Sequence, residues 1–136
     1  MQKYPPKQLP TGFLSKVKNM TYQRGDIVEL SLILPPGNKV QPHPVVIVSN
    51  EDVHNGDDCY IGVMLTHSEQ IDVFAFELSN EMFTKPNTDK YAQARCHLIT
   101  YFLESHVNAN YKNRMKENSV NQLVEHVFYS ALNKLY

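Results

Sequence analysis

Five short apolar segments, each bounded by turn-forming residues, constrain the fold of this chain more than any other feature. They are rich in Ile, Val, Leu and Phe, as strands of small β-proteins are. The segments are residues 26–34, 44–49, 60–65, 73–78 and 92–100. Pro, Gly and Asn punctuate the connections, and residues 50–58 are predicted to be a polar loop with a turn at Asn55-Gly56. This spacing predicts a mainly β fold, a small antiparallel barrel or sandwich of about five to seven strands.

One helix is predicted at the C-terminal end of the chain. Ser119 and Gln122 have the spacing of a capping box. The apolar residues that follow lie on one helical stripe, which is expected to pack on the barrel. They are Val120, Leu123, Val124, Val127, Phe128, Ala131, Leu132 and Leu135.

The composition is that of one globular domain. The chain has 136 residues, of which 42% are hydrophobic and 20% charged. No apolar run approaches the roughly 18 residues of a membrane span, and no secretory signal precedes the domain, so a cytoplasmic protein is expected. Cys59 and Cys96 lie in apolar segments and are expected to be reduced, buried thiols.

Charge is distributed unevenly although the net charge is only −1. Residues 1–24 hold five bases and no acid, residues 25–82 hold ten acids and one lysine, and residues 83–136 hold seven bases and four acids. A phosphate-facing surface should therefore come from the two ends of the sequence or from local groups such as Arg95. Residues 1–23 are predicted to be a basic extension, and residues 24–136 the barrel domain with its helix.

Four short motifs stand in a fixed order along the chain. They are Arg24-Gly25-Asp26-Ile27-Val28, Pro44-Val45-Val46-Ile47-Val48-Ser49, Thr66, and Ala94-Arg95-Cys96-His97-Leu98-Ile99-Thr100. In this order they resemble the PemK/MazF family of toxins. The first two resemble its opening and second strands, Thr66 falls where the family has a threonine at the end of the third strand, and the last resembles a late strand of the PemK branch. The chain has His43 where most members have arginine, and His97 where that branch has aspartate.

The resemblance implies a fold, an activity and partners. The fold would be a small SH3-like barrel with a C-terminal helix, usually in a homodimer. The activity would be sequence-specific cleavage of single-stranded RNA without a metal or other cofactor, through a 2′,3′-cyclic phosphate. A cognate antitoxin would normally block the RNA groove with an extended segment.

Metal-free RNA cleavage needs a base, an acid and a cation at the phosphate. Histidines can serve as base and acid near neutral pH, and arginine matches phosphate oxygens. Arg95 and His97 project from the same face of an alternating strand, because side chains repeat every two residues. The hypothesis is that His97 and His43 share the acid and base roles, Arg95 binds the scissile phosphate, and Thr66 with His67 donates hydrogen bonds.

Further contacts to RNA are predicted at Ser68, Lys85 and Lys90, with Tyr60 and Tyr91 as stacking surfaces. The histidines and cysteines lack zinc-site spacing, so no metal site is expected.

Each candidate also has a structural interpretation. His43 could pack between its flanking prolines, Arg95 and His97 could pair with an acid such as Glu77, and residues 66–68 could be an ordinary strand end. Two other functions stay open: a non-enzymatic binding module like the gyrase-poisoning toxins, and a catalytically degenerate protein that binds RNA or an antitoxin-like peptide.

Overall fold

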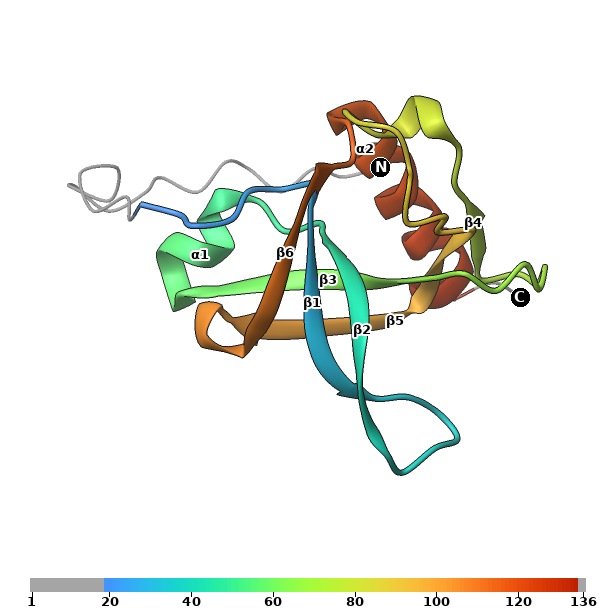
Figure 1. Ribbon diagram of the computed structural model, residues 1–136, viewed down its shortest axis with the longest axis horizontal. Coiled ribbons are helices and arrows are strands. Elements are labelled where there is room, and N and C mark those ends of the chain that lie inside the picture. The colour runs from blue at the N-terminus through green and yellow to red at the C-terminus, as the bar shows by residue number, and fades with distance from the viewer. Residues whose placement is uncertain (1–18, 135–136) are drawn as a thin grey trace.

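A computed structural model describes residues 19–134, which form one six-stranded antiparallel sheet and a C-terminal helix (Figure 1). The strands are β1 (Asp26–Ile33), β2 (Val40–Ile47), β3 (Cys59–Thr66), β4 (Ala75–Glu77), β5 (Gln93–Leu103) and β6 (Val107–Arg114). The helices are α1 (Glu51–Asp57) and α2 (Glu117–Val127), with short turns η2 (Asn80–Met82) and η3 (Glu104–His106) and a π-helical end, η4 (Phe128–Leu132). The strand order is β4-β5-β3-β2-β1-β6. The predicted mainly β class with a C-terminal helix is confirmed.

Two apolar cores lie on opposite faces of the sheet because the strands alternate. Val46 packs in the first core with Val63, Cys96 and the buried residues of α2. Its neighbours Val45 and Ile47 pack in the second core with Tyr60 and Phe102. Figure 1 shows β1, β2 and β6 crossing in front of β3 and β5, an arrangement that encloses the second core between the two parts of the sheet.

Gly25 ties three elements together at the start of β1. Its N–H donates to the Ile47 carbonyl at 2.7 Å, and its carbonyl accepts from the Met115 N–H at 2.8 Å. Its φ of +97° is open to glycine and costly for other residues. A Cβ at this position would collide with the Met115 carbonyl oxygen, so glycine is required sterically as well.

The predicted loop at residues 50–58 is wrong, because residues 51–57 form helix α1. The Asn50 side chain accepts hydrogen bonds from the N–H groups of Asp52 and Val53. Glu51 and Asp52 add negative charge to the first turn, and the helix ends at Asp58 in the left-handed conformation. The N-cap and the two acidic residues of the first turn stabilise the helix, and this stabilisation outweighs the tendency of Asn55-Gly56 to form a turn.

Three strand predictions also need correction. Strand β2 begins at Val40 and runs through Pro42 and Pro44, where it pairs with β1 but not with β3. Missing N–H groups are tolerated where a strand lacks one neighbour. Strand β4 is shorter than predicted because a turn at Asp72, whose carboxylate accepts from Phe74 N–H, occupies its start. Strand β6 was not predicted, since its sequence is mostly polar.

The C-terminal helix begins at Glu117, two residues before the predicted cap, and Ser119 is buried inside it. Val120, Leu123 and Val127 form the packing face. The rest of the predicted stripe is not buried: Val124, Phe128 and Leu132 are exposed, Ala131 is half-buried, and Leu135 lies outside the described residues. The predicted packing face was too wide for two reasons. Residues 124 and 128 lie at its edge, and the α-helix changes to a π-helix at η4, which alters the direction of the side chains beyond residue 127.

Both cysteines are free thiols. Cys96 is buried, and burial raises the pKa of its thiol to about 11. Cys59 is only half-buried, which corrects the prediction for that residue. Residues 1–18 of the predicted basic extension lie outside the described part of the chain. None of the helices between residues 19 and 134 is long and apolar enough to cross a bilayer.

The Gly25 junction predicts a sharp difference between two glycines. Gly25→Ala should lower the free energy of unfolding by about 2 kcal/mol or more, because of both the positive φ and the collision. Gly56→Ala is the control: a Cβ there meets nothing within 4 Å, and alanine in a helix should be neutral or stabilising by up to about 1 kcal/mol. Urea denaturation followed by circular dichroism measures both. Equal stability of the two variants would contradict the role given to Gly25.

Candidate functional site

A pocket of about 220 Å³ gathers four of the predicted site residues from two strands and the loop between β3 and β4. Thr66 stands at the end of β3, Ser68 follows it, and Arg95 and His97 project from one face of β5. Apolar walls come from the neighbouring elements, namely Leu34 and Pro35 after β1, Met64 on β3 and Leu98 on β5. The predicted side-by-side placement of Arg95 and His97 matches this geometry.

Arg95 is held by a two-point ion pair with Asp72. Its two terminal nitrogens lie 2.8 Å from the two oxygens of that carboxylate, and one of them also donates to Gln93 Oε1 at 2.9 Å. The Arg95 guanidinium lowers the pKa of the Asp72 carboxyl, chiefly through these hydrogen bonds. Three of its five N–H groups are used in these bonds, so two remain to meet a ligand oxygen.

His97 lies against the ring of Phe74, with ring centroids 4.1 Å apart. Partial burial lowers the pKa of His97 below its ordinary value; the positive charge of Arg95 lowers it further, and Asp72 opposes the shift. The imidazole is therefore neutral at pH 7. A neutral imidazole at the mouth of a pocket is suited to accept a proton.

The two hydroxyl residues are fixed by local backbone bonds. Thr66 Oγ1 accepts from the Ser68 N–H at 3.2 Å, and Ser68 Oγ accepts from the Gln70 N–H at 3.3 Å. Each hydroxyl therefore still carries a hydrogen to donate into the pocket. Such bonds are typical of an ordinary strand end, which was the structural interpretation of residues 66–68. They are also compatible with a role of both hydroxyl groups in RNA binding.

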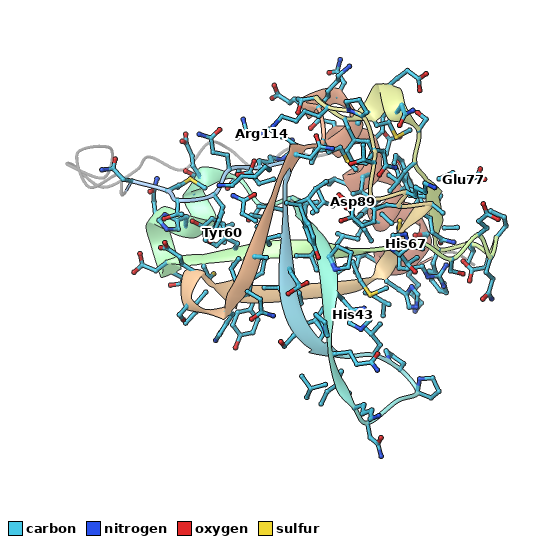
Figure 2. All side chains as sticks on the ribbon, viewed as in Figure 1. His43, Tyr60, His67, Glu77, Asp89 and Arg114 are labelled. Atoms are coloured by element: carbon cyan, nitrogen blue, oxygen red, sulfur yellow. The ribbon has the colours of Figure 1, made fainter. Side chains whose placement is uncertain are left out.

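His43 stands on β2 opposite Leu30 of β1 and is not among the residues that line the pocket. It lies two residues before Val45, which pairs with the pocket residue Met64. Directly opposite residues of antiparallel strands project from the same face, and so do residues two apart along a strand. His43 therefore projects from the pocket side of β2, beyond the point where β2 and β3 cease to pair. Figure 2 shows it near the lower end of β2.

The predicted RNA-binding residues are dispersed. The His67 ring turns back to its own loop, with Nδ1 3.1 Å from the Lys90 carbonyl oxygen and the ring beside Tyr91. Lys90 has a left-handed backbone (φ 58°), and Lys85 lines a different groove near Arg114. Tyr60 and Tyr91 are buried in the cores, so neither ring can stack on a base; this corrects their predicted role.

Sequence reasoning missed the residues that position Arg95 and His97. The acid on Arg95 is Asp72, from the loop between β3 and β4, rather than Glu77, which pairs with Gln93 on β5. Gln93 has the same strand parity as Arg95 and His97, so alternation could have indicated it. Its buried amide donates to the Ser68 and Gln70 carbonyls at 2.9 and 2.6 Å and holds the loop onto the strand. No sequence pattern marks Asp72 or Phe74.

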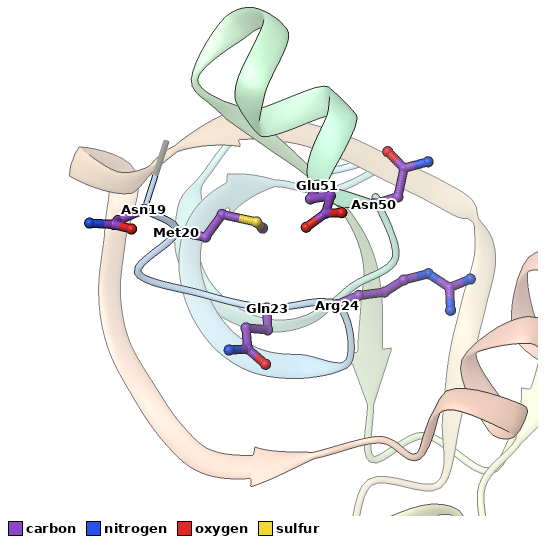
Figure 3. A pocket seen from close by; sticks show the side chains of 6 residues that line it. All are labelled: Asn19, Met20, Gln23, Arg24, Asn50 and Glu51. Carbon is purple, nitrogen blue, oxygen red and sulfur yellow. The ribbon is translucent and has the colours of Figure 1, made fainter. Parts of the chain in front are cut away.

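A larger hollow of about 780 Å³ lies apart from these residues (Figure 3). Its lining is Asn19, Met20, Gln23, Arg24, Asn50 and Glu51. Arg24 donates through Nε to the Val48 carbonyl at 3.0 Å, which makes it a structural tie between the start of β1 and the end of β2. The hollow contains none of the predicted catalytic residues. Within residues 19–134, no three His, Cys, Asp or Glu side chains are grouped so that they could hold a metal ion.

Comparison with solved structures identifies the fold. The structure superposes on a mycobacterial endoribonuclease in complex with its cognate antitoxin with a TM-score of 0.60 and 14% sequence identity, over 81% of this chain and 94% of the other. For MazF of Deinococcus radiodurans (Form-I) the TM-score is 0.61 at 9% identity, over 82% and 96%. No protein-family model and no curated protein sequence matches the chain. The chain has the fold of the MazF endoribonuclease toxins, as the sequence resemblance predicted.

The electrostatics of the pocket predict how His97 titrates. Its NMR titration midpoint should lie below the ordinary value of about 6.5. Arg95→Gln should raise the midpoint by removing a positive charge, and Asp72→Asn should lower it further by removing a negative one. The pKa of His97 is lower in the folded state than in the unfolded chain, so protonation favours the unfolded chain. The contribution of His97 to the free energy of unfolding is therefore fully present above pH 6.5 and is lost as pH falls through the folded-state pKa. Identical midpoints in all three proteins would contradict the charge arrangement.

Proposed function

We propose that the protein is an endoribonuclease that cleaves single-stranded RNA at short sequences without a metal, in the pocket of Thr66, Arg95 and His97. The observation that carries this proposal is the pocket itself. In a MazF-like fold, it places an arginine, a neutral histidine and two hydroxyl donors around a space open to solvent. These are the groups that attack by the RNA 2′-hydroxyl requires.

The proposed chemistry is an internal displacement at phosphorus. The RNA 2′-oxygen attacks the adjacent phosphorus while neutral His97 takes its proton. The bond from phosphorus to the 5′-oxygen breaks, and His43 in its protonated form gives that oxygen a proton. The products are a 2′,3′-cyclic phosphate and a 5′-hydroxyl end. Arg95, oriented by Asp72, uses its two remaining N–H groups and Thr66 its hydroxyl to stabilise the charge on the phosphoryl oxygens.

Two partners belong to the proposal. A homodimer is supported by apolar side chains that the C-terminal helix leaves exposed: Phe128, Tyr129 and Leu132 are 48%, 55% and 64% accessible. A cognate antitoxin is supported by the similar structures, of which one is a mycobacterial endoribonuclease with its antitoxin and another a MazE–MazF complex.

One observation favours a second function, a non-enzymatic binding module on the same fold. The charge of Arg95 is already matched by Asp72, and His43 does not line the pocket. In that case the pocket would bind RNA or a protein segment without cleaving it.

A cleavage assay separates the two functions. Purified protein is incubated with a long single-stranded RNA in excess EDTA, and the ends are mapped by primer extension. Discrete cuts with cyclic-phosphate ends are expected, with rates reduced at least about a hundredfold in Arg95→Ala and His97→Ala and clearly reduced in His43→Ala. His106→Gln, which changes an exposed histidine outside the pocket, should cleave normally. Intact RNA with well-folded wild-type protein would contradict the ribonuclease proposal and support the binding module.

The pH dependence of cleavage tests the role of His97 separately. A general base must be deprotonated, so the rate should fall on the acid side as pH drops through the lowered pKa of His97, below about 6.5. Asp72→Asn should move this limb to lower pH, since the Asp72 charge raises the pKa of His97. A limb that stays in place in this variant, measured from initial rates across pH 4 to 8, would mean that another group is the base.

A further inference from the structure

A second polar groove lies between β6 and the loop after η2. Its volume is about 390 Å³, and Lys85, Lys112 and Arg114 supply three bases to its lining against one acid, Asp26. Asp26 is paired with one of these bases: it accepts from Arg114 Nε at 2.7 Å and from the Gln23 N–H at 2.8 Å, which leaves the charges of Lys85 and Lys112 in excess. The remaining lining side chains, two threonines and two asparagines, are polar and uncharged.

The groove is built rather than formed by chance surface lysines. Asn113 clamps the loop to β6: its Oδ1 accepts from the Lys85 N–H at 3.1 Å and from Thr84 Oγ1 at 3.3 Å, and its Nδ2 donates to the Lys85 carbonyl at 3.3 Å. The Thr84 N–H also donates to the Arg114 carbonyl at 2.8 Å. These bonds keep Lys85 beside the bases of β6.

A bulge in β6 brings Lys112 to the groove. Between the pairs Asp26↔Arg114 and Val28↔Asn110, β6 has two more residues than β1. Lys112 lies in this bulge with a left-handed backbone (φ 60°), and its N–H donates to Asn110 Oδ1 at 2.9 Å. Bulges commonly redirect a side chain out of the regular ladder.

The positive surface continues past this groove. An adjoining hollow shares Thr84 and Arg114 with it and adds Arg24 and Lys116, with one acid, Glu117. Five of the nine Lys and Arg residues between positions 19 and 134 therefore line two connected hollows, in a chain whose net charge is −1. Figure 2 shows Arg114 at the upper end of β6, with His67 and His43 in other parts of the molecule.

We propose that this groove, defined by Lys85, Lys112 and Arg114, binds the phosphates of single-stranded RNA that extends beyond the cleavage pocket. The inference rests on the proposed function and adds a second contact region to it. Bases interleaved with amide and hydroxyl groups are the usual contacts to a phosphate backbone. An acidic protein segment fits less well, because peptide partners need apolar anchor pockets and this groove has no apolar lining residue.

Binding of an uncleavable strand tests the proposal. The probe is a fluorescein-labelled 2′-O-methyl RNA, which lacks the attacking hydroxyl, in lengths of about 5 and about 15 nucleotides. Fluorescence anisotropy at several salt concentrations gives the Kd. For Lys85→Gln/Lys112→Gln, the long probe should bind on the order of tenfold more weakly, and the slope of log Kd against log salt should shrink by about 1.4, since two phosphate contacts are lost. The short probe should bind unchanged.

A charge-matched control and a cleavage readout make the outcomes distinct. Lys39→Gln/Lys134→Gln removes the same charge outside the groove and should leave the affinity for the long probe nearly unchanged. Equal weakening in both double variants, or none in either, would overturn the proposal. Binding of a poly-glutamate peptide more tightly than the long probe, lost in the groove variant, would also overturn it, because this outcome assigns the groove to an acidic protein partner.

The groove and the cleavage site can fail independently. Lys85→Gln/Lys112→Gln should cleave a short RNA at the wild-type rate, whereas Arg95→Ala should not cleave it but should keep the length-dependent affinity. If no protein cleaves RNA and the long probe still depends on the groove lysines, the groove inference stands and the ribonuclease proposal fails. If cleavage occurs and the lysines have no effect on binding, only the groove inference fails.

Discussion

The alternation of β5 is the constraint on which the candidate site depends. Ala94 and Cys96 are completely buried in the core beneath α2, so the residues that alternate with them along the strand project from the opposite face. This fixes Gln93, Arg95 and His97 in a row next to the end of β3. A shift of one residue in β5 would bury two ionisable groups, at a cost that the sheet could not recover.

The loop between β3 and β4 turns this row of residues into a pocket. It returns across β5 and is held there by Asp72 on Arg95, Phe74 on His97 and the Gln93 amide on two loop carbonyls. Three contacts of different kinds therefore set the properties of the site. The ion pair orients the guanidinium, the aromatic contact covers one side of the His97 ring, and the amide fixes the strand end that carries Thr66 and Ser68.

The sequence predicted the parts of this arrangement that rest on periodicity. Apolar runs located β1, β3 and β5, and alternation placed Arg95 beside His97. It could not predict β6, whose polar residues are held by pairing with β1, or helix α1, where the Asn50 cap outweighs a turn signal. Asp72 and Lys112 were also beyond its reach, because a loop that returns across a strand and a bulge that redirects a lysine are consequences of tertiary structure.

We propose that the scissile phosphate of RNA binds at Arg95 in the pocket with Thr66 and His97. The most direct test is a crystal structure of the protein with a single-stranded RNA that carries a 2′-deoxy substitution at the cut site. We expect a phosphate within hydrogen-bond distance of the Arg95 guanidinium and the Thr66 hydroxyl, with the 2′-carbon facing His97. A strand bound elsewhere, with no phosphate in this pocket, would contradict it.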